Sequence, residues 1–209
     1  FGGKETQAAQ WAALAALGAV RTGRAVKCRL DRDDDMILTG KRHDFRADWK
    51  VGFDDDGRIL GVDVTFASRC GCSLDLSDSV NDRAMFHFDN AYFFEAVHIS
   101  SIRCRTNTVS NTAFRGFGGP QGTLAGERVV EAVARATGRD PLEVRKLNFY
   151  NERENRDLTP FHMKVEDFCL HELVAELETN SDYWARREAI TAYNRTKPVQ
   201  RIGLALTPV

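Results

Sequence analysis

The chain has 209 residues, 43% hydrophobic and 28% charged, so it is long and apolar enough to fold around a core. Lysine and arginine number 29 against 30 aspartates and glutamates, which leaves a net charge of −1 and excludes a global basic field for nucleic acid or anionic membranes. There is no run of roughly 18 uncharged apolar residues and no signal-peptide pattern, so we expect a soluble, cytoplasmic protein.

The cysteines and the two ends of the chain suggest a piece of a longer intracellular protein. Five scattered cysteines are unlike the dense, even usage of a disulfide scaffold, and we expect reduced thiols. Cys70 and Cys72 lie two apart without a second pair, so a zinc site is not expected. The chain opens at Phe1 rather than Met and closes on an apparent strand at 201–209.

The first fifty residues predict a helix followed by short elements. Apolar residues recur at three- and four-residue steps from Thr6 to Arg21, which predicts a buried helix that Gly23 ends. Alternation from Ala25 to Leu30 predicts a short strand, and the acidic run at 33–35 predicts the start of a short helix.

The middle of the chain predicts β-structure. Residues 44–69 alternate with period two on either side of the turn Asp54–Gly57, which predicts a β-hairpin. The pattern then changes to polar loop with a short helix between 71 and 90, and strand character returns from Val97 to Cys104.

The last third predicts helices. One runs from Gln121 to Gly138, and Asp140 is a predicted N-cap for a second that ends near Leu147. Two more are expected near 168–178 and 182–194. The predicted fold class is α+β, with mixed helices and antiparallel strands and no internal domain boundary.

Two glycine-rich segments, Phe1–Gly3 and Phe114–Gly122, each combine an aromatic residue, a glycine pair and the start of a helix. Glycine lets a ligand approach main-chain N–H groups, and a helix N-terminus favours anions, so one anionic cofactor between the two segments is one interpretation. Tight turns that only pack helices are the other. Neither segment matches a dinucleotide fingerprint or a phosphate loop.

Side chains in the second segment suggest a flat ligand. Phe114 and Phe117 can stack on a heteroaromatic ring if they are exposed, or belong to the core if they are not. By themselves, Glu5 and Arg83 are ordinary surface charges.

Four stretches resemble the molybdenum-binding portion of the xanthine dehydrogenase family, within the xanthine oxidase and aldehyde oxidase superfamily. The similarity runs along essentially the whole chain and implies part of the molybdopterin-binding domain, in the bacterial form with a separate molybdenum subunit. The matching stretches are 1–6, 31–36, 81–87 and, most specifically, 110–122, and Glu143–Asn148 matches as well.

The resemblance implies a role for each matching residue. Phe1 and Gly2 would contact the molybdenum centre and its pterin, Glu5 would hydrogen-bond the purine, and Arg83 would stabilise negative charge that develops on it. The resemblance further implies that Phe117 stacks on the purine face. It implies that the same pocket is lined by Ala113, Phe114 and Arg115. The backbones of Phe1 and Arg115 would lie near the metal.

The implied reaction is hydroxylation of hypoxanthine to xanthine and of xanthine to urate at a molybdenum–molybdopterin cofactor. Electrons would leave through iron–sulfur clusters and FAD on a partner subunit to NAD, in a heterotetramer that acts on no nucleic acid or membrane. The family's general base and further pterin contacts lie outside this chain. We therefore expect the 209-residue chain alone to be inactive; the final acceptor, NAD or oxygen, is not determined by its sequence.

Three other readings remain. Aldehyde oxidases share the glycine-rich loops but typically lack the purine-reading acid and cation, so Glu5 and Arg83 favour purines. Carbon monoxide dehydrogenases carry a cysteine in the loop that corresponds to 114–118, which has none here. A non-catalytic paralogue with a scaffold role would have no need to keep these residues.

Overall fold

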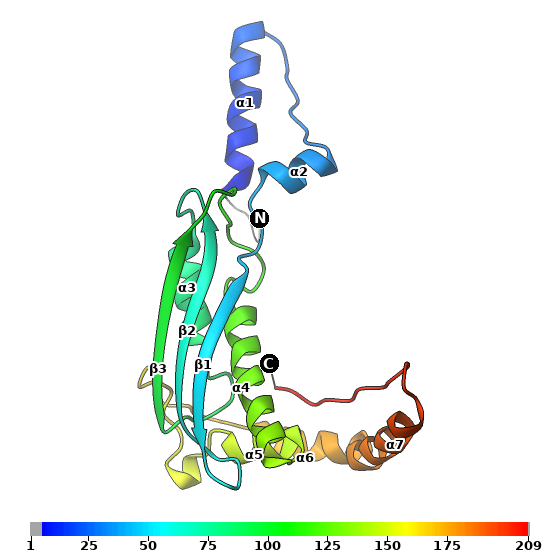
Figure 1. The fold of residues 1–209 in the computed structure, drawn as a ribbon. Coiled ribbons are helices and arrows are strands. Elements are labelled where there is room, and N and C mark those ends of the chain that lie inside the picture. The colour runs from blue at the N-terminus through cyan, green and yellow to red at the C-terminus, as the bar shows by residue number, and fades with distance from the viewer. Residues whose placement is uncertain (1–5, 209) are drawn as a thin grey trace. The chain divides into compact units, whose positions relative to one another are not determined.

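The computed structural model describes residues 6–208, which form an α+β fold as predicted (Figure 1). Its strands make a three-stranded sheet in the order β1-β2-β3. The elements in chain order are α1 (Gln7–Thr22), α2 (Arg32–Leu38), β1 (Phe45–Phe53), β2 (Ile59–Gly71), α3 (Ser77–Phe86), β3 (Ala96–Arg105), α4 (Gly119–Thr137), α5 (Pro141–Asn148), the 3₁₀ turn η1 (Glu152–Glu154), α6 (Leu170–Asn180) and α7 (Tyr183–Thr196).

The contacts divide the chain into two interleaved units. The first contains the residues up to 50 together with 63–88 and 98–125, and the second contains 51–62, 89–97 and the residues from 126 onward. The three strands and α4 each begin in one unit and end in the other. The two units are described separately below.

The predicted hairpin is confirmed, and the third strand adds a parallel pairing. β1 and β2 flank the turn at 54–57, where Gly57 N–H donates to Asp54 O (2.9 Å). On β2 and β3, Asp63 pairs with His98 and Thr65 with Ser100, so the two strands run in the same direction. The antiparallel arrangement therefore holds for the hairpin, while α3 supplies the crossover that a parallel neighbour requires.

The core of the first unit lies between the sheet and α3. Phe66 from β2 and Phe88 after α3 are fully buried and meet edge to face, with ring centroids 5.8 Å apart. Val80 and Ala84 are the buried residues of α3 that come closest to the second glycine-rich segment. A Cβ on Gly122 would overlap the carbonyl oxygen of Ala84, so α4 can begin against α3 only with glycine at this position.

The core of the second unit contains polar groups that pair with one another. Asn148 donates to Gly57 O (2.9 Å) and accepts from Ile59 N (2.8 Å), which fixes the end of the hairpin. Deeper inside, Arg145 Nε donates to Glu127 Oε2 at 2.8 Å, and the Tyr92 hydroxyl donates to Glu127 Oε1 at 2.5 Å. Burial of charge is tolerated here because each partner is hydrogen-bonded.

The helix termini follow the predicted signals. Gly23 ends α1 with a left-handed conformation (φ 62°) and donates to Ala19 O, and the carboxylate of Asp140 caps α5. The short helix expected at the acidic run 33–35 is α2, and its N-cap, which was not predicted, is Asp31. The two helices expected near 168–178 and 182–194 are α6 and α7. Among residues 6–208, no helix is sufficiently long and apolar to cross a membrane.

Three local expectations are wrong. The helix from Thr6 forms as α1, but its apolar residues are not buried: Leu14 is 54% exposed and Val20 is 82% exposed, because no described segment covers this face. Residues 25–30 and 201–208 are extended without strand pairing. Alternation of apolar and polar residues makes a strand only where a neighbouring strand supplies hydrogen bonds.

We predict that Gly122→Ala lowers the free energy of unfolding by about 2 kcal/mol, because the added methyl forces α4 away from the backbone of α3. Urea unfolding of the complete protein measures this change. Gly203→Ala is the matched control, since a Cβ there meets nothing within 4 Å. Equal stability of the two variants would contradict the close approach of α3 and α4.

Candidate functional site

The second glycine-rich segment forms a tight turn directly before α4. Phe117 N–H donates to Phe114 O (2.7 Å), and Gly119 N–H donates to Gly116 O (2.9 Å). Phe117 has a left-handed backbone (φ 52°), which is uncommon for an aromatic residue and is maintained by these bonds. Phe114 is 41% exposed, so it is not a core residue, whereas Ala113 is buried.

Arg42 holds this turn from the segment before β1. Its guanidinium lies 4.3 Å from the centroid of the Phe114 ring, and its Nη2 donates to the carbonyl oxygen of Arg115 at 2.5 Å. A cation over an aromatic face contributes about 0.5–1 kcal/mol at a partly exposed site. One face of Phe114 is therefore covered, while the side chain of Arg115 remains exposed.

Asp75 joins Thr6, at the start of α1, to Thr112, which precedes the second glycine-rich segment. Its carboxylate accepts from the Thr6 hydroxyl (2.7 Å) and from the Thr112 hydroxyl (2.6 Å), and these two hydroxyl oxygens lie 3.2 Å apart. Thr6 directly follows Glu5 in the sequence and Thr112 directly precedes Ala113. Thr6, which follows Glu5, therefore contacts Thr112, two residues before Phe114, although 106 positions separate them.

The side chain of Arg83 extends from α3 next to the same loop. Its Nε donates to His87 Nε2 (3.2 Å), and a Cβ on Gly119 would lie 3.4 Å from the His87 ring. Burial and the nearby charge of Arg83 lower the pKa of His87 below 6.5, so the ring is neutral at pH 7 and its Nε2 can accept this bond. His87 thus sets the direction of the exposed Arg83 side chain.

The described residues of the site fit a polar, ring-shaped cofactor. Arg42 Nη1 is buried without a hydrogen-bond acceptor, and a Cβ on Gly116 would lie 3.7 Å from it. Gln121 donates to His43 O (2.9 Å), which leaves its buried Oε1 without a donor. An unused donor and an unused acceptor on residues of this turn and its neighbour suit a pterin, which carries both kinds of group.

Three predicted site residues, Phe1, Gly2 and Glu5, lie outside the described residues. Within residues 6–208, no three His, Cys, Asp or Glu side chains gather in a way that could hold a metal ion. All five cysteines are free thiols, as expected, and Cys70 is buried against Ser68.

Sequence reasoning missed the residues that position the site. Asp75, Arg42 and His87 carry no recognisable motif of their own, because each acts through a partner that is distant in the chain or one helical turn away. The only available signal was that His87 and Thr112 fall inside stretches already singled out for their resemblance.

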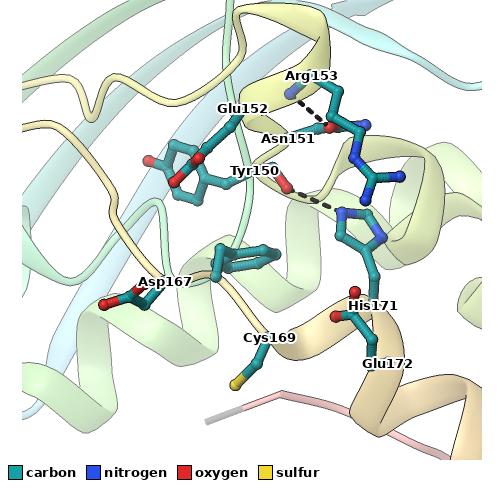
Figure 2. A pocket seen from close by; sticks show the side chains of 9 residues that line it. Tyr150, Asn151, Glu152, Arg153, Asp167, Cys169, His171 and Glu172 are labelled. Carbon is teal, nitrogen blue, oxygen red and sulfur yellow. Dashed lines mark hydrogen bonds between the residues drawn. The ribbon is translucent and has the colours of Figure 1, made fainter.

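A separate pocket of about 690 Å³ lies in the second unit, and none of the described residues predicted for the site lines it (Figure 2). Its wall includes His171, whose Nε2 lies 2.9 Å from the carbonyl oxygen of Tyr150, together with Cys169 and Glu172. The size of a cavity alone therefore does not identify the candidate site in this chain.

We predict that Arg42→Met loosens the aromatic turn, because it removes both the bond to Arg115 O and the cation over Phe114. The amide of Phe117, which is protected by its bond to Phe114 O, should exchange with deuterium about tenfold faster in the complete protein. Arg46→Met is the control, since within residues 6–208 the side chain of Arg46 pairs with Asp48 of β1 and with no residue of the turn. Unchanged exchange in the Arg42 variant would contradict its role as a brace.

Sequence comparisons agree with this geometry. The family described as the molybdopterin cofactor-binding domain matches residues 1–149. Xanthine dehydrogenase from Drosophila subobscura is 44% identical over 208 residues, and xanthine dehydrogenase/oxidase from Mus musculus is 45% identical over the same length. In each case the match covers 100% of this chain and 15% of the relative, so the chain spans about a seventh of their length.

Solved structures show the same fold. Aldehyde oxidoreductase from Desulfovibrio gigas superposes with a TM-score of 0.77 at 28% identity, over 86% of this chain and 19% of that one. Quinoline 2-oxidoreductase from Pseudomonas putida superposes with a TM-score of 0.73 at 22% identity, over 87% of this chain and 24% of that one. At this identity the similarity shows a shared fold and nothing of function. The chain thus belongs to the molybdopterin cofactor-binding domain family.

Proposed function

We propose that this chain carries part of the purine-hydroxylating site of a xanthine dehydrogenase that converts hypoxanthine to xanthine and xanthine to urate. The observation that carries the proposal is the convergence of three segments in the first unit. Asp75 ties Thr6, next to Glu5, to Thr112 at the aromatic turn, and α3 brings Arg83 to the start of α4. The 44% identity to xanthine dehydrogenase supports the same reading.

In this proposal each residue has a distinct task. Glu5 hydrogen-bonds the purine, and Arg83 stabilises the negative charge that builds up on the ring as it is hydroxylated. Phe117 packs on the purine face, while Ala113 and Phe114 shape the pocket. His87 and Arg42 act indirectly, because the first orients Arg83 and the second braces the turn.

The cofactor is the molybdenum–molybdopterin group, held by Phe1, Gly2 and Arg115, with the backbones of Phe1 and Arg115 near the metal. When bound, it supplies the two-electron oxidant for hydroxylation of a ring carbon. The general base belongs to the remainder of the molybdenum subunit. We place the iron–sulfur clusters and FAD on a partner subunit of a cytoplasmic heterotetramer, with NAD as the acceptor.

Aldehyde oxidation is the second candidate, favoured by the structural similarity to the aldehyde oxidoreductase of Desulfovibrio gigas. The two functions differ in what they require of the substrate pocket. A purine presents several ring nitrogens and oxygens that an acid and a cation can bind, whereas an aromatic aldehyde presents one carbonyl group. The roles of Glu5 and Arg83 therefore separate the two.

We predict that the complete protein, assembled with its partner subunit, prefers xanthine to an aromatic aldehyde. Glu5→Ala and Arg83→Met should each lower kcat/KM for xanthine about a hundredfold, the usual effect of removing one group that stabilises developing charge. Both variants should spare the aldehyde. Arg128→Met, which removes an exposed arginine paired with Glu131, is the control and should change neither value.

The same assay has clear opposing outcomes. Preference for the aldehyde, or indifference of xanthine turnover to both substitutions, would favour the aldehyde reading. Molybdenum content of the purified complete protein is measured in parallel. A protein that is folded but free of molybdenum would favour a scaffold role instead.

A further inference from the structure

A small pocket rich in arginine lies within the second unit, apart from the candidate site. It has a volume of about 210 Å³, enough for a small molecule or ion with its hydration water. Its wall comes from α4, α5, α7 and the C-terminal segment, through Glu131, Arg135, Arg145, Tyr183, Arg187 and the backbone near Leu204. Three of these side chains are cations and one is an anion.

Arg145 has a hydrogen-bond donor that its protein partners leave unused. The side chain is 1% exposed, and its Nε is bonded to Glu127. Its Nη2 has no hydrogen-bond acceptor, since Glu131 is 3.6 Å away. A buried guanidinium N–H without an acceptor is costly, so an acceptor supplied by a ligand would stabilise this site.

The other hydrogen-bond donors around the pocket are of two kinds. Some are fixed by contacts with the protein, and others are available to a ligand. Arg187 is bonded to Asp140 and donates to Leu204 O (3.1 Å), which anchors the C-terminal segment as one wall. Arg135 is exposed and forms no ion pair or hydrogen bond with the rest of residues 6–208. Burial raises the pKa of the Tyr183 hydroxyl, so it stays protonated and able to donate.

The acidic groups near the pocket do not neutralise all of its positive charge. Glu127 and Asp140 are engaged by Arg145 and Arg187, and Glu131 also pairs with Arg128 at 3.1 Å. Arg135 remains without a carboxylate partner among the described residues. Guanidinium groups match the geometry of phosphate and carboxylate oxygens, which can each accept one N–H of the planar fork.

We propose that this pocket binds a small oxyanion, either inorganic phosphate or the phosphoryl or carboxylate group of a small molecule. The anion would take the unused N–H of Arg145 and the free charge of Arg135, with the Tyr183 hydroxyl as a further donor. Because the pocket lies wholly in the second unit, this proposal is independent of the purine reaction.

Isothermal titration of the complete protein with inorganic phosphate, in a buffer with excess chloride, tests the proposal. Arg135→Gln should weaken phosphate binding about tenfold, because it removes one charge-assisted contact. The matched control is Arg186→Gln, which removes an equal charge from α7 outside the pocket and should leave binding unchanged. Tyr183→Phe should weaken binding by a smaller factor and reports on the same pocket without altering charge.

Each outcome of the titration either supports or overturns the proposal of an oxyanion site. Saturable binding that Arg135→Gln weakens and Arg186→Gln does not would support it. Competition by acetate at similar concentration would show that the pocket also accepts a carboxylate, and failure of acetate to compete would show that it selects a phosphoryl group. No saturable binding, equal loss in the two arginine variants, or displacement by chloride would overturn it.

Discussion

The candidate site depends first on the carboxylate of Asp75. It accepts hydrogen bonds from Thr6 and Thr112, and so holds the start of α1 against the residues that precede the aromatic turn. A carboxylate that accepts two hydroxyl hydrogen bonds stabilises the fold more than a neutral acceptor would, because hydrogen bonds to a charged group are roughly twice as strong. Together with the direct hydrogen bond between the two threonine hydroxyls, this link joins the segment that follows Glu5 to the aromatic turn.

The glycines of the second segment serve packing as well as any ligand. Gly118 and Gly122 lie where a side chain would overlap the backbone of α3, so the close approach of α3 and α4 requires them. This approach also places His87 and Arg83 next to the turn. The two interpretations of the glycine-rich segment are therefore compatible: the glycines let α3 and α4 pack closely, and the aromatic turn that leads into α4 keeps Phe114 exposed.

The second unit contains buried charged side chains that are paired with one another. Glu127 accepts hydrogen bonds from both Arg145 and Tyr92, and this arrangement leaves the buried Nη2 of Arg145 without an acceptor. Removing one partner of such a pair would strand a buried charge, which is far more costly than losing an exposed ion pair. The network therefore constrains how α4 and α5 pack, and it positions the arginine-rich pocket beside them.

Local patterns in the sequence were sufficient to predict the β-hairpin, the C-terminal end of α1 at Gly23 and the N-cap of α5, because these depend on neighbouring residues. The resemblance of 110–122 identified the aromatic turn. Tertiary structure alone decided that residues 25–30 find no strand partner, that the apolar face of α1 stays exposed, and that Asp75, Arg42 and His87 organise the site. These features depend on contacts made by folding, which spacing along the chain does not encode.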